Sequence, residues 1–327
     1  SNIGNIAMGA LSMDAGAVTR INLNSPSGAS SIISVTGDAA VNGTLNLVST
    51  PAYGAGVYRV ITTGGTLTDN GMVLGETQPD YTFRIDTQPQ SLDVVVTALD
   101  TTVQYWSADG TTRGGGGNWT SGNNWLGAGG GYAVWAGDTA VFDGPFGIVM
   151  VDGTQSFNTI EFLTSGYTLQ AGVSGQLNLG AGGRLWAEGD DIIVTVAAPI
   201  IGTGALTKIG EGTIVLSGIN TYQGGTIIQA GTLEISSDAN LGDAAGSITF
   251  AGGELEATTT LTSARNVVLN AQATISVEEA STLTLTGTLS GTAGLVFGGG
   301  KLVLSGTNTY QGATIIGSGT LSLTGTG

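Results

Sequence analysis

The sequence predicts an all-β protein that coils as a parallel β-helix. Short strings that alternate apolar with polar residues recur, as at 213–216, 232–235 and 301–304, and such alternation indicates half-buried strands. Gly accounts for 57 of the 327 residues, and no long stretch has the apolar period of a helix. One segment of 20 residues occurs twice, and so short a unit buries its apolar face only by stacking on a neighbour. Strands stacked in this way run parallel, about 4.8 Å apart.

The repeated segment defines the most regular part of the predicted β-helix. Residues 216–235 and 304–323 share 14 of 20 residues at an offset of 88, and related Gly-rich segments precede both copies. We therefore expect a regular β-helix over 149–327, with the repeats at 202–235 and 291–323. If the whole chain coiled at about 22–25 residues per turn, it would form roughly 13–15 turns.

Two other regions depart from this regular pattern. Residues 1–104 contain alternating strings that are irregular and interrupted by Pro. Residues 105–148 contain four of the five Trp residues, together with runs of Gly and Asn, and break the aliphatic pattern. We therefore predict three parts: an N-terminal β-helical or irregular strand region at 1–104, a Trp/Gly/Asn-rich block at 105–148, and the regular β-helix at 149–327.

The repeat resembles the passenger-associated repeat of type V autotransporters. The resemblance is carried by 204–233, by the matching motif at 294–323, and more loosely by the Trp block with 140–142 and 166–169. It implies a right-handed β-helical passenger, exported through the outer membrane of a Gram-negative bacterium by its own C-terminal β-barrel translocator. The protein would then be extracellular or anchored at the cell surface. Since the chain stops within a repeat pattern and begins without Met or a signal peptide, we expect it to be a piece of a longer protein.

Composition excludes several classes of chemistry. The chain has no His and no Cys, which excludes Ser–His–Asp and Cys–His catalysis, His-ligated zinc, disulfides and Fe–S clusters. The net charge is −16, with 8 basic and 24 acidic residues, so the chain would repel nucleic-acid phosphates and anionic membrane surfaces. No apolar run reaches the ~18 residues of a transmembrane helix. We expect no cofactor, no metal and no nucleic-acid partner.

Carboxylates and lysines offer weak candidate sites. Glu254 and Glu256 are two residues apart on a predicted strand, so their side chains share one face about 6.6 Å apart, near the separation in an inverting glycosidase. A solvated strand face is favoured, because no basic or aromatic residue lies nearby in sequence to hold a sugar. A β-helical carbohydrate-active enzyme remains an alternative, provided that these two groups and Asp238 converge. Lys208 and Lys301 are expected to be exposed at corners.

The Trp block supplies the candidate residues for contact with a partner or a glycan. These are Trp119, Trp125, Tyr132 and Trp135, because Trp and Tyr are enriched in binding patches. The competing interpretation is a satellite hydrophobic cluster that closes an irregular region.

The function predicted from these observations is non-enzymatic. We expect an extracellular passenger fragment of an autotransporter, a β-helical stalk or adhesin-type scaffold for surface presentation, self-association or host contact. A glycan-binding module centred on the Trp block is a further alternative. Expected partners are the translocator, a host surface protein or glycan, and sister passengers.

Overall fold

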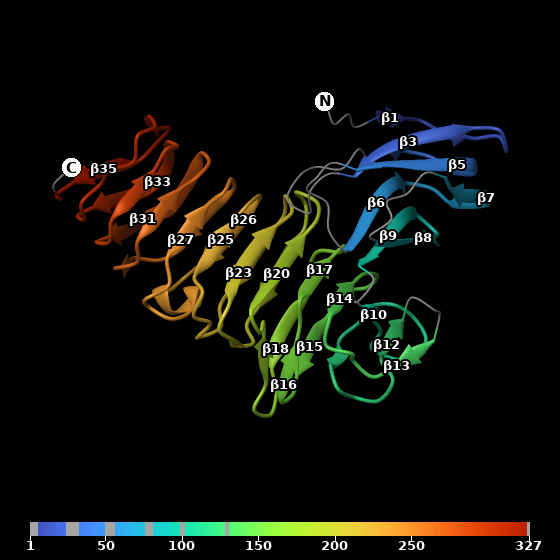
Figure 1. The fold of residues 1–327 in the computed structure, drawn as a ribbon, viewed down its shortest axis with the longest axis horizontal. Coiled ribbons are helices and arrows are strands. Elements are labelled where there is room, and N and C mark those ends of the chain that lie inside the picture. The colour runs from blue at the N-terminus through green and yellow to red at the C-terminus, as the bar shows by residue number, and fades with distance from the viewer. Residues whose placement is uncertain are drawn as a thin grey trace. The chain divides into compact units, whose positions relative to one another are not determined.

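The structure is a computed structural model that describes residues 6–23, 33–49, 56–75, 81–98, 102–127 and 131–325. These residues form a parallel β-solenoid of about 12 turns (Figure 1), and the predicted fold class is confirmed. Within these ranges there is no α-helix, and the helical element is the short 3₁₀ turn η1 (Asp238–Leu241). The chain divides into two compact units, 1–103 and 104–327. The three-part division expected from the sequence stays a prediction.

The first unit combines parallel stacking with antiparallel pairing. Its described strands are β1 (Ile6–Met8), β2 (Leu11–Ser12), β3 (Val18–Leu23), β4 (Ile33–Val35), β5 (Ala39–Ser49), β6 (Gly56–Thr63), β7 (Leu67–Leu74), β8 (Tyr81–Gln88) and β9 (Ser91–Ala98). β4 stacks parallel between β1 and β6, and β5 stacks parallel with β2, β3 and β7. β6 and β8 both pair antiparallel with β9. Because such pairing uses chain without adding a parallel turn, the solenoid has fewer turns than the 13–15 expected.

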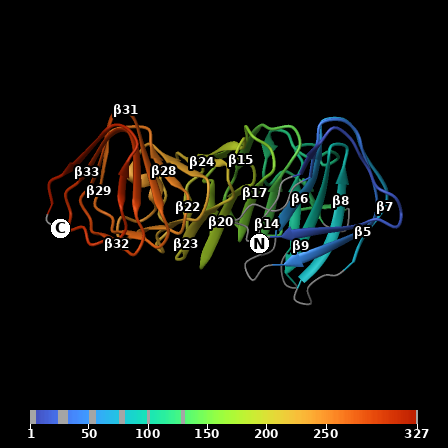
Figure 2. The same ribbon diagram turned by 90° about the horizontal axis from the view of Figure 1, so that it is seen from above.

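The second unit is built from short strands stacked turn upon turn (Figures 1 and 2). Its first strands, up to the repeats, are β10 (Val103–Trp106), β11 (Gly117–Asn118), β12 (Trp125–Gly127), β13 (Tyr132–Ala133), β14 (Thr139–Phe142), β15 (Ile148–Val151), β16 (Thr154–Ser156), β17 (Thr159–Phe162), β18 (Thr168–Ala171), β19 (Gln176–Asn178), β20 (Gly182–Ala187), β21 (Ile193–Val196) and β22 (Ile200–Ile201). The remaining strands are β23 (Ala205–Ile209), β24 (Thr213–Leu216), β25 (Thr226–Ile228), β26 (Thr232–Ile235), β27 (Ile248–Phe250), β28 (Glu254–Ala257), β29 (Leu261–Ser263), β30 (Val267–Leu269), β31 (Ala273–Leu285), β32 (Leu289–Gly291), β33 (Leu295–Leu304), β34 (Thr314–Ile316) and β35 (Thr320–Leu323).

Each turn of the second unit passes through three faces. The first face is an 11-stranded sheet that runs from β13 through β10 and β14 to β32. The second face is the main path of a 12-stranded sheet, from β11 and β15 to β34. The third face holds β16, β19 and β22 and, farther along, β29, β35 and the C-terminal halves of β31 and β33. Apart from the antiparallel β10, β12 and β13, the pairing of these named strands is parallel.

Inward-pointing side chains of successive turns stack on one another to form the core. On the second face Ile214, Leu233, Leu255 and Ile275 are in register, and all four are buried. Each such side chain stabilises the fold by roughly 1.5–3 kcal/mol relative to exposure. This stacking explains the alternating strings, since every second residue of a strand points into the core.

The repeat keeps Gly at the corner before its last strand for a steric reason. Gly231 has a φ of 58° and Gly319 a φ of 77°, both in the left-handed region. A Cβ at Gly231 would meet the carbonyl oxygen of Gly212, and a Cβ at Gly319 would meet that of Gly299. Only Gly combines this conformation with the absence of a side chain, so the corner geometry requires Gly in both copies.

The two copies of the repeat lie on different faces of the coil. In the first copy β25 pairs with β23 and β27 on the first face. The matching strand of the second copy, β34, pairs instead with the first half of β33 on the second face. The strands in register from β24 through β26, β28 and β31 to the first half of β33 span four turns. The segment of the second copy that matches β24 comes one face later, in the second half of β33. The second copy is therefore rotated about the coil by one face, a third of a turn.

A strained corner allows a stabilising substitution. Ala280 has a φ of 66°, and this left-handed conformation costs a residue with a Cβ roughly 1–2 kcal/mol. We expect Ala280→Gly to raise the free energy of unfolding by about 0.5–1 kcal/mol, measured from the guanidinium midpoint. The exposed Ala245 has no positive φ, so Ala245→Gly should give no gain. Destabilisation by Ala280→Gly would contradict this interpretation.

Candidate functional site

The Trp block packs into the beginning of the second unit's core. Trp106, Trp119 and Trp125 have no exposed surface, and they belong to the same buried cluster as the core of the following turns. Trp106 lies opposite Trp125 on the antiparallel strands β10 and β12. The ring centroids of Trp119 and Trp125 are 4.7 Å apart, and that of Phe142 lies 5.6 Å from Trp119. These rings therefore close one end of the stacked core.

The four predicted contact residues differ in how much surface they expose. Trp119 and Trp125 are fully buried, whereas Tyr132 and Trp135 are half-buried. The structure brings Trp135 to 4.6 Å from Trp125, centroid to centroid, and its indole Nε1 donates to the carbonyl oxygen of Ser156 at 2.8 Å. Contact with a partner or glycan stays a prediction for all four. Among them, Tyr132 and Trp135 keep surface that a ligand can reach.

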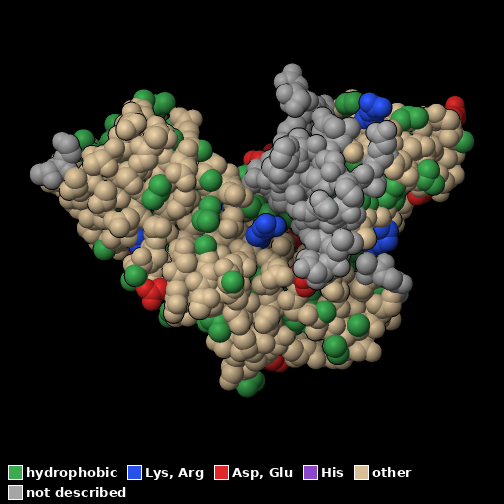
Figure 3. All heavy atoms as spheres, in the orientation of Figure 1, with side chains coloured by type: hydrophobic (Ala, Val, Ile, Leu, Met, Phe, Trp, Pro, Cys, Tyr) green, Lys and Arg blue, Asp and Glu red, His purple; other side chains and the backbone are tan. Residues whose placement is uncertain are grey.

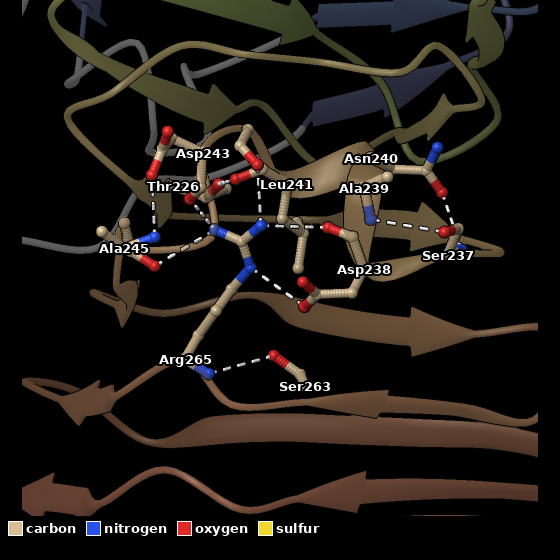
Figure 4. Close-up of polar contacts among 12 residues, drawn as sticks. Thr226, Ser237, Asp238, Ala239, Asn240, Leu241, Asp243, Ala245, Ser263 and Arg265 are labelled. Atoms are coloured by element: carbon tan, nitrogen blue, oxygen red, sulfur yellow. Dashed lines mark hydrogen bonds and ion pairs between the residues drawn. The ribbon is translucent and has the colours of Figure 1, made fainter.

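Arg265 is the most highly bonded side chain of the later turns (Figure 4). It is buried, and its Nε donates to Oδ1 of Asp238 at 2.9 Å. Its Nη2 donates to the carbonyl oxygens of Asp238, at 3.1 Å, and Gly242, at 2.7 Å, and its Nη1 donates to those of Asp243 and Gly246. A single guanidinium from the next turn thereby holds five acceptors on residues 238–246, here called the η1 segment.

Reasoning from the sequence missed this arrangement. Arg265 follows Asp238 by 27 residues, and nothing in the local pattern indicates that the two meet. One signal was available: with 8 basic residues in 327, a lone Arg in an otherwise uncharged stretch is a candidate for a buried structural role.

The first repeat copy places a polar clamp between turns. Asn220 is buried, accepts the backbone N–H of Ile200 at Oδ1 (2.7 Å) and donates from Nδ2 to the carbonyl oxygen of Asn240. Two residues on, the hydroxyl of Tyr222 lies 2.7 Å from that of Thr226, and burial raises the pKa of Tyr222. The repeat therefore fixes three consecutive turns to one another through satisfied buried polar groups.

Lys208 lies in the core, and the expectation that it is exposed is wrong. Its position on β23 is in register with the buried Leu185 and Ile228, so its side chain points inward. At the corner, Nζ donates to the carbonyl oxygens of Ile209 (3.1 Å), Gly210 and Ala230. Burial lowers the pKa of Lys208 to about 7. Lys301, by contrast, is exposed as expected.

The carboxylates weighed as a catalytic pair lie on the outward side of the second face. Glu254 and Glu256 are both half-buried, and Glu256 is in register with Glu234 on the preceding strand. Burial and the charge of Glu256 raise the pKa of Glu254. Asp238 does not join them, because its carboxylate is bound to Arg265. The described residues contain no group of three or more metal-ligating side chains.

Comparison with protein families finds the passenger-associated-transport-repeat at 206–235 and 297–326. The chain is also 33% identical over 310 residues to the adhesin BmaC autotransporter of Brucella suis biovar 1 (strain 1330). The chain is part of the passenger region of an autotransporter. The alignment covers 86% of the chain but 9% of that relative, so this passenger segment spans a small part of the relative's length. No solved structure matches it.

The matched segments of the passenger contain some of its buried polar contacts, whereas the Arg265 clamp lies between the two segments. Asn220, Tyr222 and Thr226 fall in the first segment, and the second contains the same pairing, with the hydroxyls of Tyr310 and Thr314 2.5 Å apart. Passengers are displayed outside the Gram-negative cell, so the segment is extracellular or exposed at the cell surface. Its described part holds no helix of the length and apolarity needed to cross a membrane.

Lys208 makes the stability of the passenger depend on pH. Its ordinary pKa is 10.5, so between about pH 7 and 10 the unfolded chain binds a proton at Lys208 that the folded protein releases. Stability therefore rises with pH in this window, by about 2–3 kcal/mol between pH 7.5 and 9.5. Guanidinium midpoints at the two pH values should differ in the native chain and coincide in Lys208→Met. Equal midpoints in the native chain would show that the three carbonyls keep the ammonium charged.

Proposed function

We propose that the passenger segment is a non-enzymatic, adhesin-type scaffold that presents binding surfaces outside the cell. The relative reported above is named an adhesin, and the likeness to it extends over 86% of the chain. The observation that carries the proposal is the continuous parallel stacking of the second unit from β14 to β35, held by buried clamps at Asn220 and Arg265. Such a stack keeps its surface groups at fixed spacings of about 4.8 Å, which suits presentation.

The surface of the segment favours binding to a partner over catalysis. On the face drawn in Figure 3 the second unit exposes mostly backbone and uncharged polar side chains. The carbohydrate-active enzyme is not favoured, because it requires Asp238 to converge on Glu254 and Glu256, and Asp238 is held by Arg265 instead. The proposed partners are the protein's own C-terminal translocator and a host surface protein or glycan, or sister passengers.

Removal of the segment tests the proposed function. In the source bacterium, an in-frame deletion of this segment should reduce adhesion to host-cell monolayers severalfold. Surface staining with an antibody against another part of the passenger controls for export. The purified segment coated on beads should confer adhesion that albumin-coated beads lack. Unchanged bacterial adhesion together with inert beads would refute the adhesin role.

Glycan contact through the Trp block has its own test. Tyr132 and Trp135 are half-buried and accessible, so Tyr132→Ala and Trp135→Ala should weaken glycan-array signals if these rings stack on sugars. Equal signals from both variants and the native chain would remove this role.

A further inference from the structure

Three large apolar side chains lie exposed at neighbouring positions of the second face. Phe146, Ile148 and Ile193 are 64%, 54% and 54% exposed. Gly166 donates its N–H to the carbonyl oxygen of Ile193, and a Cβ at Gly166 would come within 2.8 Å of the Phe146 ring. The ring of Phe146 therefore lies over the gap left by Gly166, beside Ile193. Ile148 is in register with Thr168 on the next turn. Contiguous exposed apolar groups on a soluble surface mark interaction sites.

The same face becomes acidic at β26, two turns beyond β21, the strand that carries Ile193. Outward positions continue from Ile148 through Thr168, Thr195 and Val215 to Glu234 and Glu256, each in register with the next.

Burial and the charges of Glu256 and Glu278 raise the pKa of Glu234, and burial with the charge of Glu256 raises that of Glu254. In the described part of the chain, none of the carboxylates of Glu234, Glu254 and Glu256 forms an ion pair. This is an uncompensated negative patch on the same face as the apolar one, with β24 between the two.

We infer that this face binds an extended polypeptide segment that has bulky apolar residues at one end and Lys or Arg at the other. The inference rests on the proposed contact function and specifies its partner. From Ile148 to Glu256 there are five strand spacings, about 24 Å, which an extended segment of about seven residues spans. The apolar half of the segment covers Phe146, Ile148 and Ile193, and its cations neutralise Glu234 and Glu256.

The charge of the chain favours a foreign partner over a second copy. The passenger carries 8 basic against 24 acidic residues, and its two lysines are the buried Lys208 and the exposed Lys301. Another copy would thus bring mainly like charge to the acidic half of the face, which costs binding energy. An acidic glycan would be repelled by the uncompensated carboxylates.

Binding of designed peptides to the folded chain tests the inference. The probe is a fluorescent peptide with Leu in its first half and Lys in its second, compared with a version that has Glu in place of Lys. We expect the Lys peptide to bind at least about tenfold more tightly. Ile148→Thr combined with Ile193→Thr should weaken it about tenfold, and Glu234→Gln combined with Glu256→Gln should weaken it and remove its salt dependence. The matched control is Ile227→Thr, on the outward side of the first face, which should change nothing.

The outcomes separate this inference from the adhesin proposal. Thr already occupies neighbouring outward positions, such as Thr168 and Thr213, so these variants should stay folded, as circular dichroism checks. Equal binding by all variants, or no preference for the Lys peptide, overturns the inference. So does dimerisation of the native chain that Ile148→Thr with Ile193→Thr abolishes, since the occupant is then a second copy. If bead adhesion survives in variants that have lost peptide binding, the adhesin role stands and this face is not its contact surface.

Discussion

Replacing Arg265 with Ala is expected to lower the free energy of unfolding of the surrounding turns by about 3–5 kcal/mol. The substitution removes the donors of five hydrogen bonds and leaves Asp238 with a partly buried, unpaired charge. The carbonyl oxygens of Gly242 and Gly246 lose their donor inside the fold, where an unsatisfied group costs about 1–3 kcal/mol. Amide hydrogen exchange should report faster opening of 236–247 than in the native chain, together with a lower guanidinium midpoint.

Two variants separate the contributions to this effect. Asp238→Asn keeps most of the shape but removes the charge, and should cost about 1 kcal/mol, because the four carbonyl contacts of Arg265 remain. Arg184 is exposed on β20, and Arg184→Ala should change the stability by less than about 0.5 kcal/mol. If Arg265→Ala proves as mild as Arg184→Ala, the guanidinium is not a significant clamp on the η1 segment.

Trp125→Ala should have a comparable effect at the other end of the second unit. Trp125 is fully buried against Trp106, Trp119 and Trp135, with centroid distances of 5.3, 4.7 and 4.6 Å. Truncation of a buried Trp leaves a cavity and typically costs about 3–5 kcal/mol. Its Nε1 also donates to the carbonyl oxygen of Trp119, which would lose this donor. The loss should appear as an earlier unfolding transition in near-ultraviolet circular dichroism, where the Trp signal dominates.

The half-buried Trp135 provides the matched comparison. Trp135→Ala removes an aromatic ring from the same cluster, but much of that ring is in contact with solvent, so the loss should be about half as large. Equal effects of the two substitutions would contradict the burial order described for the block. Because Trp125→Ala perturbs the fold, a binding defect in this variant alone would say nothing about ligand contact.

The repeat and its alternating strings were sufficient to predict the stacked parallel strands. Identical Gly231 and Gly319, and apolar residues at every second position, follow directly from the geometry of a coil that turns corners between short strands. The shared outward face of Glu254 and Glu256 was also predictable, since it depends on the two-residue period alone.

Contacts between turns were beyond the reach of the sequence. From β14 onward the turn lengths vary, from 19 residues between Thr213 and Thr232 to 27 between Thr168 and Thr195, so the pattern does not say which residues of neighbouring turns meet. The position of Lys208 beside a strand corner predicts exposure, whereas the register places its side chain inside. The antiparallel pairing of the Trp block likewise depends on contacts that no local period encodes.

The rotation between the two repeat copies has a consequence for multivalent binding. Equivalent loops that are 88 residues apart point in directions that differ by about 120°, so a flat receptor surface cannot engage both at once. In any stack that keeps this spacing, the same loop would return to the same azimuth only with every third copy. Avidity on one side of such a stalk would then have a long axial period of about 13 turns, roughly 60 Å.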